Sequence, residues 1–357
     1  MKKIFLLILV LLSIPTLFAQ DVSEGVYVKK TNESQFNLLK SRNEFTIDHI
    51  SEQGFELYGP VGTSQFLKFN NIEFEFLKKI PVTIAATYPS PEEIELELKS
   101  LTSKYSSISK MFSIGNSVKK RSLWVIKISK NVGVNDHRPE FKYIANMHGD
   151  EIVGRELMVR FIKDLLSQYG KDQQITNLID RAQIYIMPSM NPDGAANKNR
   201  GNANSIDLNR NFPDFSTNDN KDTTLGRQPE TQAVMNWQTQ RNFKLSANFH
   251  GGAEVVNYPW DTSASKFPEQ DYLKELSLEY AGLTPYIAMS STFKNGITNG
   301  YAWYEVNGGM QDWSLYYKKD LQLTIELSNP KWPEYDKIDF YYQENKIALL
   351  NLIQRVL

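Results

Sequence analysis

The chain has 357 residues, with 40 lysines and arginines against 41 acidic residues, and it contains no cysteine. This balanced charge gives no electrostatic reason to expect nucleic acid or an anionic membrane as a partner. The absence of cysteine excludes disulfides and a cysteine nucleophile, so the fold depends on its core, with or without a metal. The length suits one large domain and one small domain.

Residues 1–19 have the pattern of a secretory signal peptide. Lys2 and Lys3 precede an apolar run from Ile4 to Leu12, and small and polar residues follow as far as Ala19. The run is too short to cross a bilayer as a helix, so we expect no membrane span here. We expect cleavage after Ala19 and export to the periplasm or the medium. No cysteine follows that could take a lipid, so we expect no lipid attachment there.

Residues 20–85 are predicted to form a small α+β domain. Its segments are "GVYVKK", "ESQFNLLKS", "FTIDHI", "GFELYG", "TSQFLKF" and "FEFLKK". Their patterns give the order βαββαβ, for which a ferredoxin-like fold is the simplest architecture. Prolines at 81, 89 and 91 mark a linker into a helix that starts at about Pro91, so we place the domain boundary near residue 85.

Residues 86–357 alternate between strand and helix patterns and are predicted to form the larger domain. The strand candidates are "LWVIKIS", "FKYIANM", "QIYIMP", "LSANF" and "LQLTIEL". Residues 152–169 have the spacing of apolar residues typical of an amphipathic helix, and residues 335–356 read as a terminal helix. The pattern predicts an α/β fold in which helices cover both faces of a central sheet.

Three ionisable residues lie near the ends of these predicted strands. His148 follows "FKYIANM", His250 follows "LSANF", and Glu326 lies late in "LQLTIEL". Functional sites in such sheets collect where strands end and loops begin. Taken alone, the stretch "NMHGDE" favours a turn that contains His148, after which Asp150 and Glu151 open a helix and complement its positive end.

Five further motifs, read together with these residues, point to one family of proteins. In chain order they are "SMNPDG", "NRGNANSIDLNRNFPD", "NFHGG", "TNGYAWYEVNGGMQDW" and "TIELSNP". With them, roughly residues 91 to 330 resemble the zinc metallocarboxypeptidases (the M14 family), specifically the branch that contains carboxypeptidases N, E, D and M. The resemblance implies a mixed central sheet flanked by helices and a metalloprotease that hydrolyses C-terminal peptide bonds.

The resemblance implies one Zn²⁺ per chain, bound by His148, Glu151 and His250. A His, Glu, His set is a standard ligand combination for catalytic zinc, which keeps a fourth position for water. Asp207 matches the family residue that accepts the other ring N–H of the first histidine and so orients it. Asp207 would otherwise be an ordinary turn or cap aspartate.

The catalytic residues implied by the resemblance are Glu326 and Arg200. Glu326 matches the general base that takes a proton from the zinc-activated water and passes it to the leaving amine. Its apolar flanks argue against a solvated edge position, because a buried charge needs a partner or a function. Arg200 matches the arginine that stabilises the tetrahedral oxyanion, although by itself it reads as a solvated loop arginine.

The resemblance also implies how a substrate is held. Asn209 and Arg210 match the clamp for the C-terminal carboxylate, for which a guanidinium offers two parallel hydrogen bonds. Tyr304 matches the mobile tyrosine that closes over the bound terminus; the ordinary alternative is a core aromatic. These residues imply recognition of peptide or protein C-termini by a monomeric enzyme.

Asp261 and Gln311 match the positions that line the side-chain pocket in the lysine- and arginine-selective branch. A partly buried carboxylate there selects a cationic side chain, so we expect preference for C-terminal Arg or Lys. Alternatively, Asp261 caps the following loop and does not contact the pocket. The Pro259–Trp260 bond aligns with a non-proline cis peptide of the family.

Two features depart from the family pattern. Few residues follow Glu326, so we expect no C-terminal transthyretin-like domain, whereas residues 20–85 precede the enzyme where this branch usually has no pro-segment. That small domain could be a removable inhibitory domain, a folding aid or a permanent accessory domain, and "AATYPS" is an accessible place to cut. Two other functions stay open: a bacterial cell-wall stem-peptide peptidase of the same superfamily, and a non-catalytic peptide-binding protein.

Overall fold

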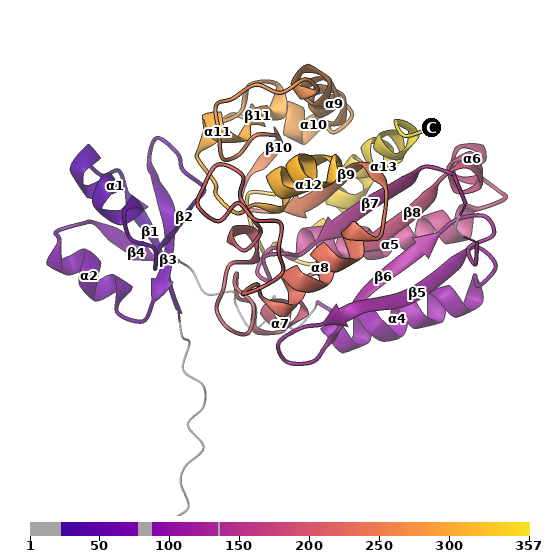
Figure 1. The fold of residues 1–357 in the computed structure, drawn as a ribbon, viewed down its shortest axis with the longest axis horizontal. Coiled ribbons are helices and arrows are strands. Elements are labelled where there is room, and N and C mark those ends of the chain that lie inside the picture. The colour runs from indigo at the N-terminus through magenta and orange to yellow at the C-terminus, as the bar shows by residue number, and fades with distance from the viewer. Residues whose placement is uncertain (1–22, 78–87, 135) are drawn as a thin grey trace, which may run out of the picture. The chain divides into compact units, whose positions relative to one another are not determined.

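The computed structural model describes residues 23–77, 88–134 and 136–357, and the chain divides into two compact units, Met1–Leu77 and Lys78–Leu357 (Figure 1). The predicted signal peptide and the predicted boundary near residue 85 lie outside the described residues. Within the described ranges, no helix is both long enough and apolar enough to cross a membrane.

The first unit has the predicted βαββαβ order. Its elements are β1 (Ser23–Lys29), α1 (Glu33–Lys40), β2 (Thr46–Asp48), β3 (Gly54–Pro60), α2 (Thr63–Phe69) and β4 (Phe74–Phe76). The strands pair in the order β2-β3-β1-β4, every neighbour antiparallel, which is the ferredoxin-like arrangement. Helix α1 begins at a capping box in which the Asn32 side chain accepts the Gln35 N–H and Gln35 accepts the Asn32 N–H.

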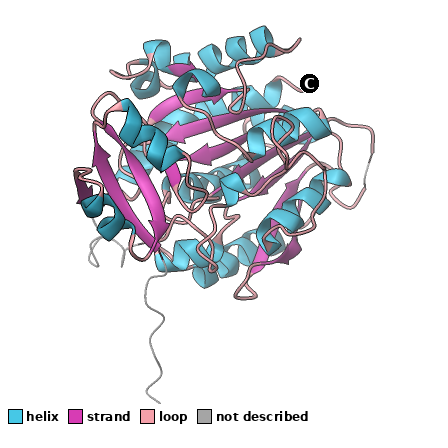
Figure 2. Cartoon of the chain, turned by 60° about the vertical axis from the view of Figure 1, so that its left-hand side comes forward, coloured by secondary structure: helices cyan, strands magenta, loops and turns pink. Residues whose placement is uncertain are grey.

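The second unit is built on one eight-stranded sheet covered by helices (Figure 2). Its strands are β5 (Ser109–Asn116), β6 (Ser122–Ile128), β7 (Glu140–Ala145), β8 (Gln183–Met187), β9 (Phe243–His250), β10 (Glu254–Tyr258), β11 (Ile297–Asn299) and β12 (Leu321–Leu327). They pair in the order β11-β10-β12-β9-β7-β8-β6-β5. The pairs from β12 through β9 and β7 to β8 are parallel, whereas β10–β12, β8–β6 and β6–β5 are antiparallel. The expected mixed sheet is therefore confirmed.

The α-helices of this unit precede its first strand, connect its strands or follow its last strand. They are α4 (Pro91–Lys104), α5 (Val153–Gln168), α6 (Gln173–Arg181), α7 (Pro192–Asn197), α8 (Pro229–Thr239), α9 (Gln270–Gly282), α10 (Pro285–Ala288), α11 (Gly300–Trp303), α12 (Met310–Lys318) and α13 (Lys337–Gln354). Helix α4 begins as predicted, at Pro91, after a capping box of Ser90 and Glu93.

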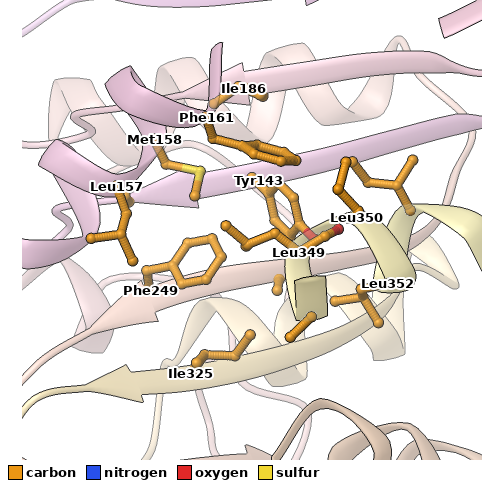
Figure 3. Close-up of a cluster of buried hydrophobic side chains, with 14 of the residues drawn as sticks. Tyr143, Leu157, Met158, Phe161, Ile186, Phe249, Ile325, Leu349, Leu350 and Leu352 are labelled. Atoms are coloured by element: carbon orange, nitrogen blue, oxygen red, sulfur yellow. The ribbon is translucent and has the colours of Figure 1, made fainter. Parts of the chain in front are cut away.

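Hydrophobic side chains cover both faces of the sheet. On one face, Tyr143 and Phe249 from the strands pack with Phe161 of α5 and Leu349 of α13 (Figure 3). On the other, residues of α8 and α12, including Trp313, pack against the alternate strand residues. This two-sided burial explains why the central strands read as continuous apolar runs. It also fixes the strand ends that position the site.

Candidate metal and catalytic site

His148 and Glu151 lie on the loop that joins β7 to α5. Helix α5 begins at Val153, so Glu151 precedes the helix and does not form its first turn. The Asn146 side-chain amide donates to the carbonyls of His148, Gly149 and Glu151 over 2.9, 3.3 and 3.2 Å. A Cβ on Gly149 would lie 2.1 Å from the backbone of Gly194, so only glycine fits at this position. The loop is thereby held in one tight conformation.

Three side chains bring possible metal ligands together. The Nδ1 atoms of His148 and His250 are 3.0 Å apart, and each lies 2.9 Å from a carboxylate oxygen of Glu151. All three residues are buried. Two facing imidazole nitrogens cannot both donate a hydrogen bond to one another. A cation between them could instead be bound by both nitrogens and by the Glu151 carboxylate. Burial lowers the pKa of His250, which favours the neutral ring that a metal needs, whereas at His148 burial is outweighed by the carboxylates of Glu151 and Asp207, which raise the pKa. The group therefore fits a zinc ion.

Asp207 contacts the opposite nitrogen of the first histidine. Its Oδ1 is 3.1 Å from His148 Nε2 and also accepts the Asn209 N–H at 2.8 Å, at the start of a short 3-10 helix, Leu208–Arg210. Burial would raise the pKa of Asp207, but Arg200 and His148 outweigh it and hold the pKa well below its usual range. The carboxylate thus both caps this turn and orients His148.

Arg200 and Glu326 complete this first cluster from two other elements. The Arg200 Nε donates to Asp207 Oδ2 at 2.9 Å, and its Nη1 donates to Glu151 Oε1 at 3.3 Å. In the parallel pairing of β12 with β9, Glu326 lies directly beside His250. Side chains of paired strand residues project to the same face, so Glu326 shares the face of the sheet from which His250 projects. Both Arg200 and Glu326 are buried.

A second cluster surrounds Asp261. Its Oδ1 accepts hydrogen bonds from Asn257 Nδ2 and Gln311 Nε2, each at 3.0 Å. Burial raises the pKa of Asp261 to about 6, against the opposing charge of Arg210. Asn209 joins the cluster because its Oδ1 accepts the Met310 N–H at 3.0 Å. The predicted clamp and the predicted pocket residues are therefore neighbours.

Tyr304 lies on the segment that borders this second cluster. Its ring contacts that of Trp303, with 4.9 Å between centroids, and the side chain is half-buried. Two backbone bonds tie the segment to the Asp261 loop, Tyr301 N–H to the Trp260 carbonyl at 2.8 Å and Val306 N–H to the Asp261 carbonyl at 3.0 Å. The Pro259–Trp260 bond is cis, as the resemblance implied.

The sequence did not point to two charged neighbours of these clusters. Lys331 Nζ lies 3.7 Å from Glu151 Oε1 and 3.9 Å from Asp150 Oδ2. Asp312 accepts backbone N–H groups of the loop that contains Asp261. No periodicity marks the irregular stretch around Lys331. The only signal for Asp312 was its place next to Gln311.

Another possible metal-binding group lies in the first unit, formed by Asp48, His49 and Glu56. His49 Nδ1 lies 3.3 Å from Asp48 and 3.2 Å from Glu56, and the Tyr58 hydroxyl donates to Glu56 at 2.5 Å. A histidine that is hydrogen-bonded to a carboxylate explains this geometry without a metal.

Comparisons with known proteins place these clusters in context. The family model described as zinc carboxypeptidase matches residues 94–348. Carboxypeptidase M of Mus musculus is 43% identical over 306 residues, covering 78% of this chain and 68% of that protein. Carboxypeptidase D of Anas platyrhynchos is 40% identical over 291 residues, covering 74% of this chain but only 20% of its own length. The crystal structure of carboxypeptidase A from Helicoverpa armigera matches the fold with a TM-score of 0.74 at 17% identity, covering 94% of this chain and 97% of that one.

Proposed function

We propose that this chain, which belongs to the zinc carboxypeptidase family, is an exopeptidase that releases C-terminal arginine or lysine from peptides and proteins. One observation supports the proposal most directly. The Nδ1 atoms of His148 and His250 and the carboxylate of Glu151 lie within about one hydrogen-bond length of one another, and Glu326 is paired beside His250. Export through the predicted signal peptide belongs to the same proposal.

His148, Glu151 and His250 would hold the zinc ion. Bound zinc supplies Lewis-acid chemistry, polarising the scissile carbonyl and activating water. Asp207 keeps the first histidine in the required orientation through its Nε2. Because the ligands come from a loop and a distant strand, the site exists only in the folded chain.

Glu326 and Arg200 perform the proton transfer and the charge stabilisation. Glu326 takes a proton from the attacking water and delivers it to the leaving amine nitrogen, which must be protonated to depart. Arg200 presents a guanidinium that is oriented by Asp207 and Glu151, so a donor is in place where negative charge develops on the carbonyl oxygen. No step requires a covalent link between substrate and enzyme.

Asn209, Arg210 and Tyr304 recognise the end of the substrate. Arg210 Nη1 donates to the Asn209 carbonyl at 3.0 Å, so the guanidinium is held on the turn that Asp207 caps. A guanidinium and an amide side by side suit a terminal carboxylate, and Tyr304 would close over it. Asp261, with Gln311, would then attract the cationic side chain of the residue that is released.

The direct test compares two peptides that differ only in the chemical group at the C-terminus. One ends in arginine with a free carboxylate and the other ends in arginine amide, and mass spectrometry follows loss of the last residue from each. The proposal predicts release from the acid alone, since only that peptide satisfies Arg210. Equal cleavage of both peptides would contradict the proposal. A third peptide, a cell-wall stem peptide with D-configured residues, is added to the assay, and cleavage of that peptide alone would also contradict the proposal.

A further inference from the structure

The loop that contains Asp261 is held by a second buried acid. Asp312, in the first turn of α12, accepts the Asp261 N–H at 3.0 Å and 2.9 Å on its two oxygens and the Thr262 N–H at 2.9 Å. These bonds go to the neighbouring loop and not to the amides of its own helix. Asp312 therefore does more than complement the positive end of α12.

The first turn of α12 holds both the side chain and the backbone of Asp261. Gln311 bonds its carboxylate, and Asp312, the next residue, bonds its backbone. With Asn257 and Gln311 both on Oδ1, no described residue donates a hydrogen bond to Oδ2. We therefore expect Oδ2 to be the oxygen that meets a cationic ligand, because burial makes an uncompensated charge costly there.

The position of the Asp261 carboxylate allows little adjustment. A Cβ on Gly300 would lie 1.7 Å from Asp261 Oδ1, so the neighbouring segment leaves no spare space. On the other side, Asp214 accepts the Thr262 hydroxyl at 3.2 Å and the Gly308 N–H at 2.8 Å. A small movement of the loop would thus displace the carboxylate from its amide donors.

We propose that Asp312 is a positioning residue for side-chain selectivity, which holds the loop so that Asp261 Oδ2 meets the cationic group of a C-terminal arginine or lysine. The inference rests on the proposed function and deepens it. Asp312 contacts no substrate itself and acts only through Asp261.

Asp261 and Asp312 are two buried acids whose electrostatic surroundings can be named. Burial, and then the Asp261 charge, raise the pKa of Asp312 well above its usual range, and Asp214 and Arg210 are the other charged groups that act on Asp261.

The experiment uses the full chain loaded with zinc and two peptides that end in arginine or leucine. In Asp312→Asn, kcat/KM for the arginine peptide should fall about 10-fold or more through KM, because displaced recognition groups lose their effect steeply with distance. The leucine peptide should be unaffected. In an Asp261→Asn background, Asp312→Asn should cause no further loss of selectivity.

Asp222→Asn is the matched control, because Asp222 lies in a loop and contacts the same helix from outside. Asp222 accepts the Trp313 indole N–H and pairs with Lys318, away from Asp261, so selectivity should be retained. If Asp312→Asn does not fold, Asp312→Glu keeps the carboxyl group but shifts its position, and it should lose the same selectivity. Wild-type selectivity in a folded Asp312 variant overturns this inference alone. A wild-type chain without preference overturns the proposed selectivity and this inference with it.

Discussion

Glu326 lies beside the predicted ligand His250 but does not belong to the ligand group. Its substitution can therefore test catalysis without removing a metal ligand. We expect Glu326→Gln to lower turnover of an arginine-ending peptide by about 10²- to 10⁴-fold, the usual effect of general acid–base catalysis. Zinc content by elemental analysis should stay at one ion per chain. Glu254→Gln on the neighbouring strand is the control, and near-normal turnover in Glu326→Gln would remove this residue from the mechanism.

Asp261 predicts a pH dependence of selectivity. Burial raises its pKa to about 6, so the carboxyl is neutral below that pH and negative above it. The ratio of kcat/KM for arginine- over leucine-ending peptides should therefore rise as the pH increases through about 6, since kcat/KM reports groups of the unliganded enzyme. Dividing by the leucine peptide cancels titrations that affect both. Asp261→Asn should give a flat ratio, and a rising one would refute the assignment.

At the residue scale, short motifs identified more than single residues did. The stretches around His148, His250 and Glu326 were recognisable because they stand, in the family's order, with several longer motifs at the ends of predicted strands. Lys331 and Asp312 were missed because their contacts come from loop packing between segments far apart in the chain. Such contacts leave no periodic trace in the sequence.

At the element scale, a buried ion pair holds the central sheet together. Lys142 of β7 donates to Asp320 at 2.5 Å and to Ser246 of β9 at 3.1 Å, and both charges are fully buried. Lys142→Met leaves the Asp320 charge without its cation, which should cost about 3–5 kcal/mol of unfolding free energy.

Urea unfolding followed by tryptophan fluorescence measures this effect in the second unit alone. All six tryptophans lie beyond Leu77, so the first unit contributes no signal. The double variant Lys142→Met with Asp320→Leu should recover much of the loss, because no lone charge remains. A single variant as stable as wild type would show that the pair is not stabilising.

The elements that the sequence predicted are those with strong periodicity. The βαββαβ order of the first unit, helix α5 and the central strands are confirmed. Strands β5, β10 and β11 were not predicted. Two of them are the edge strands of the sheet, and β5 has a mixed pattern of burial, so neither continuous apolar runs nor strict alternation marks them.

At the scale of the whole molecule, the metal should stabilise the second unit. The ligand group joins the β7–α5 loop to the end of β9, and a ligand at about 1,000 times its Kd adds about 4 kcal/mol to the folded state. A chelator should therefore lower the thermal midpoint reported by tryptophan fluorescence, and zinc should restore it. His148→Ala should show no such shift, and a chelator effect that persists in this variant would assign the metal elsewhere.

The most direct measurement is release of the last residue from matched peptides that end in Arg, Lys, Leu, Phe or Glu. Zinc-loaded protein is tested both whole and without residues 20–85, because an inhibitory role is one of three that the sequence allows for that segment. We predict that Arg and Lys are released much faster than Leu, Phe and Glu. Release of Leu and Phe instead would contradict the role of Asp261, and no release from either form would contradict the exopeptidase itself.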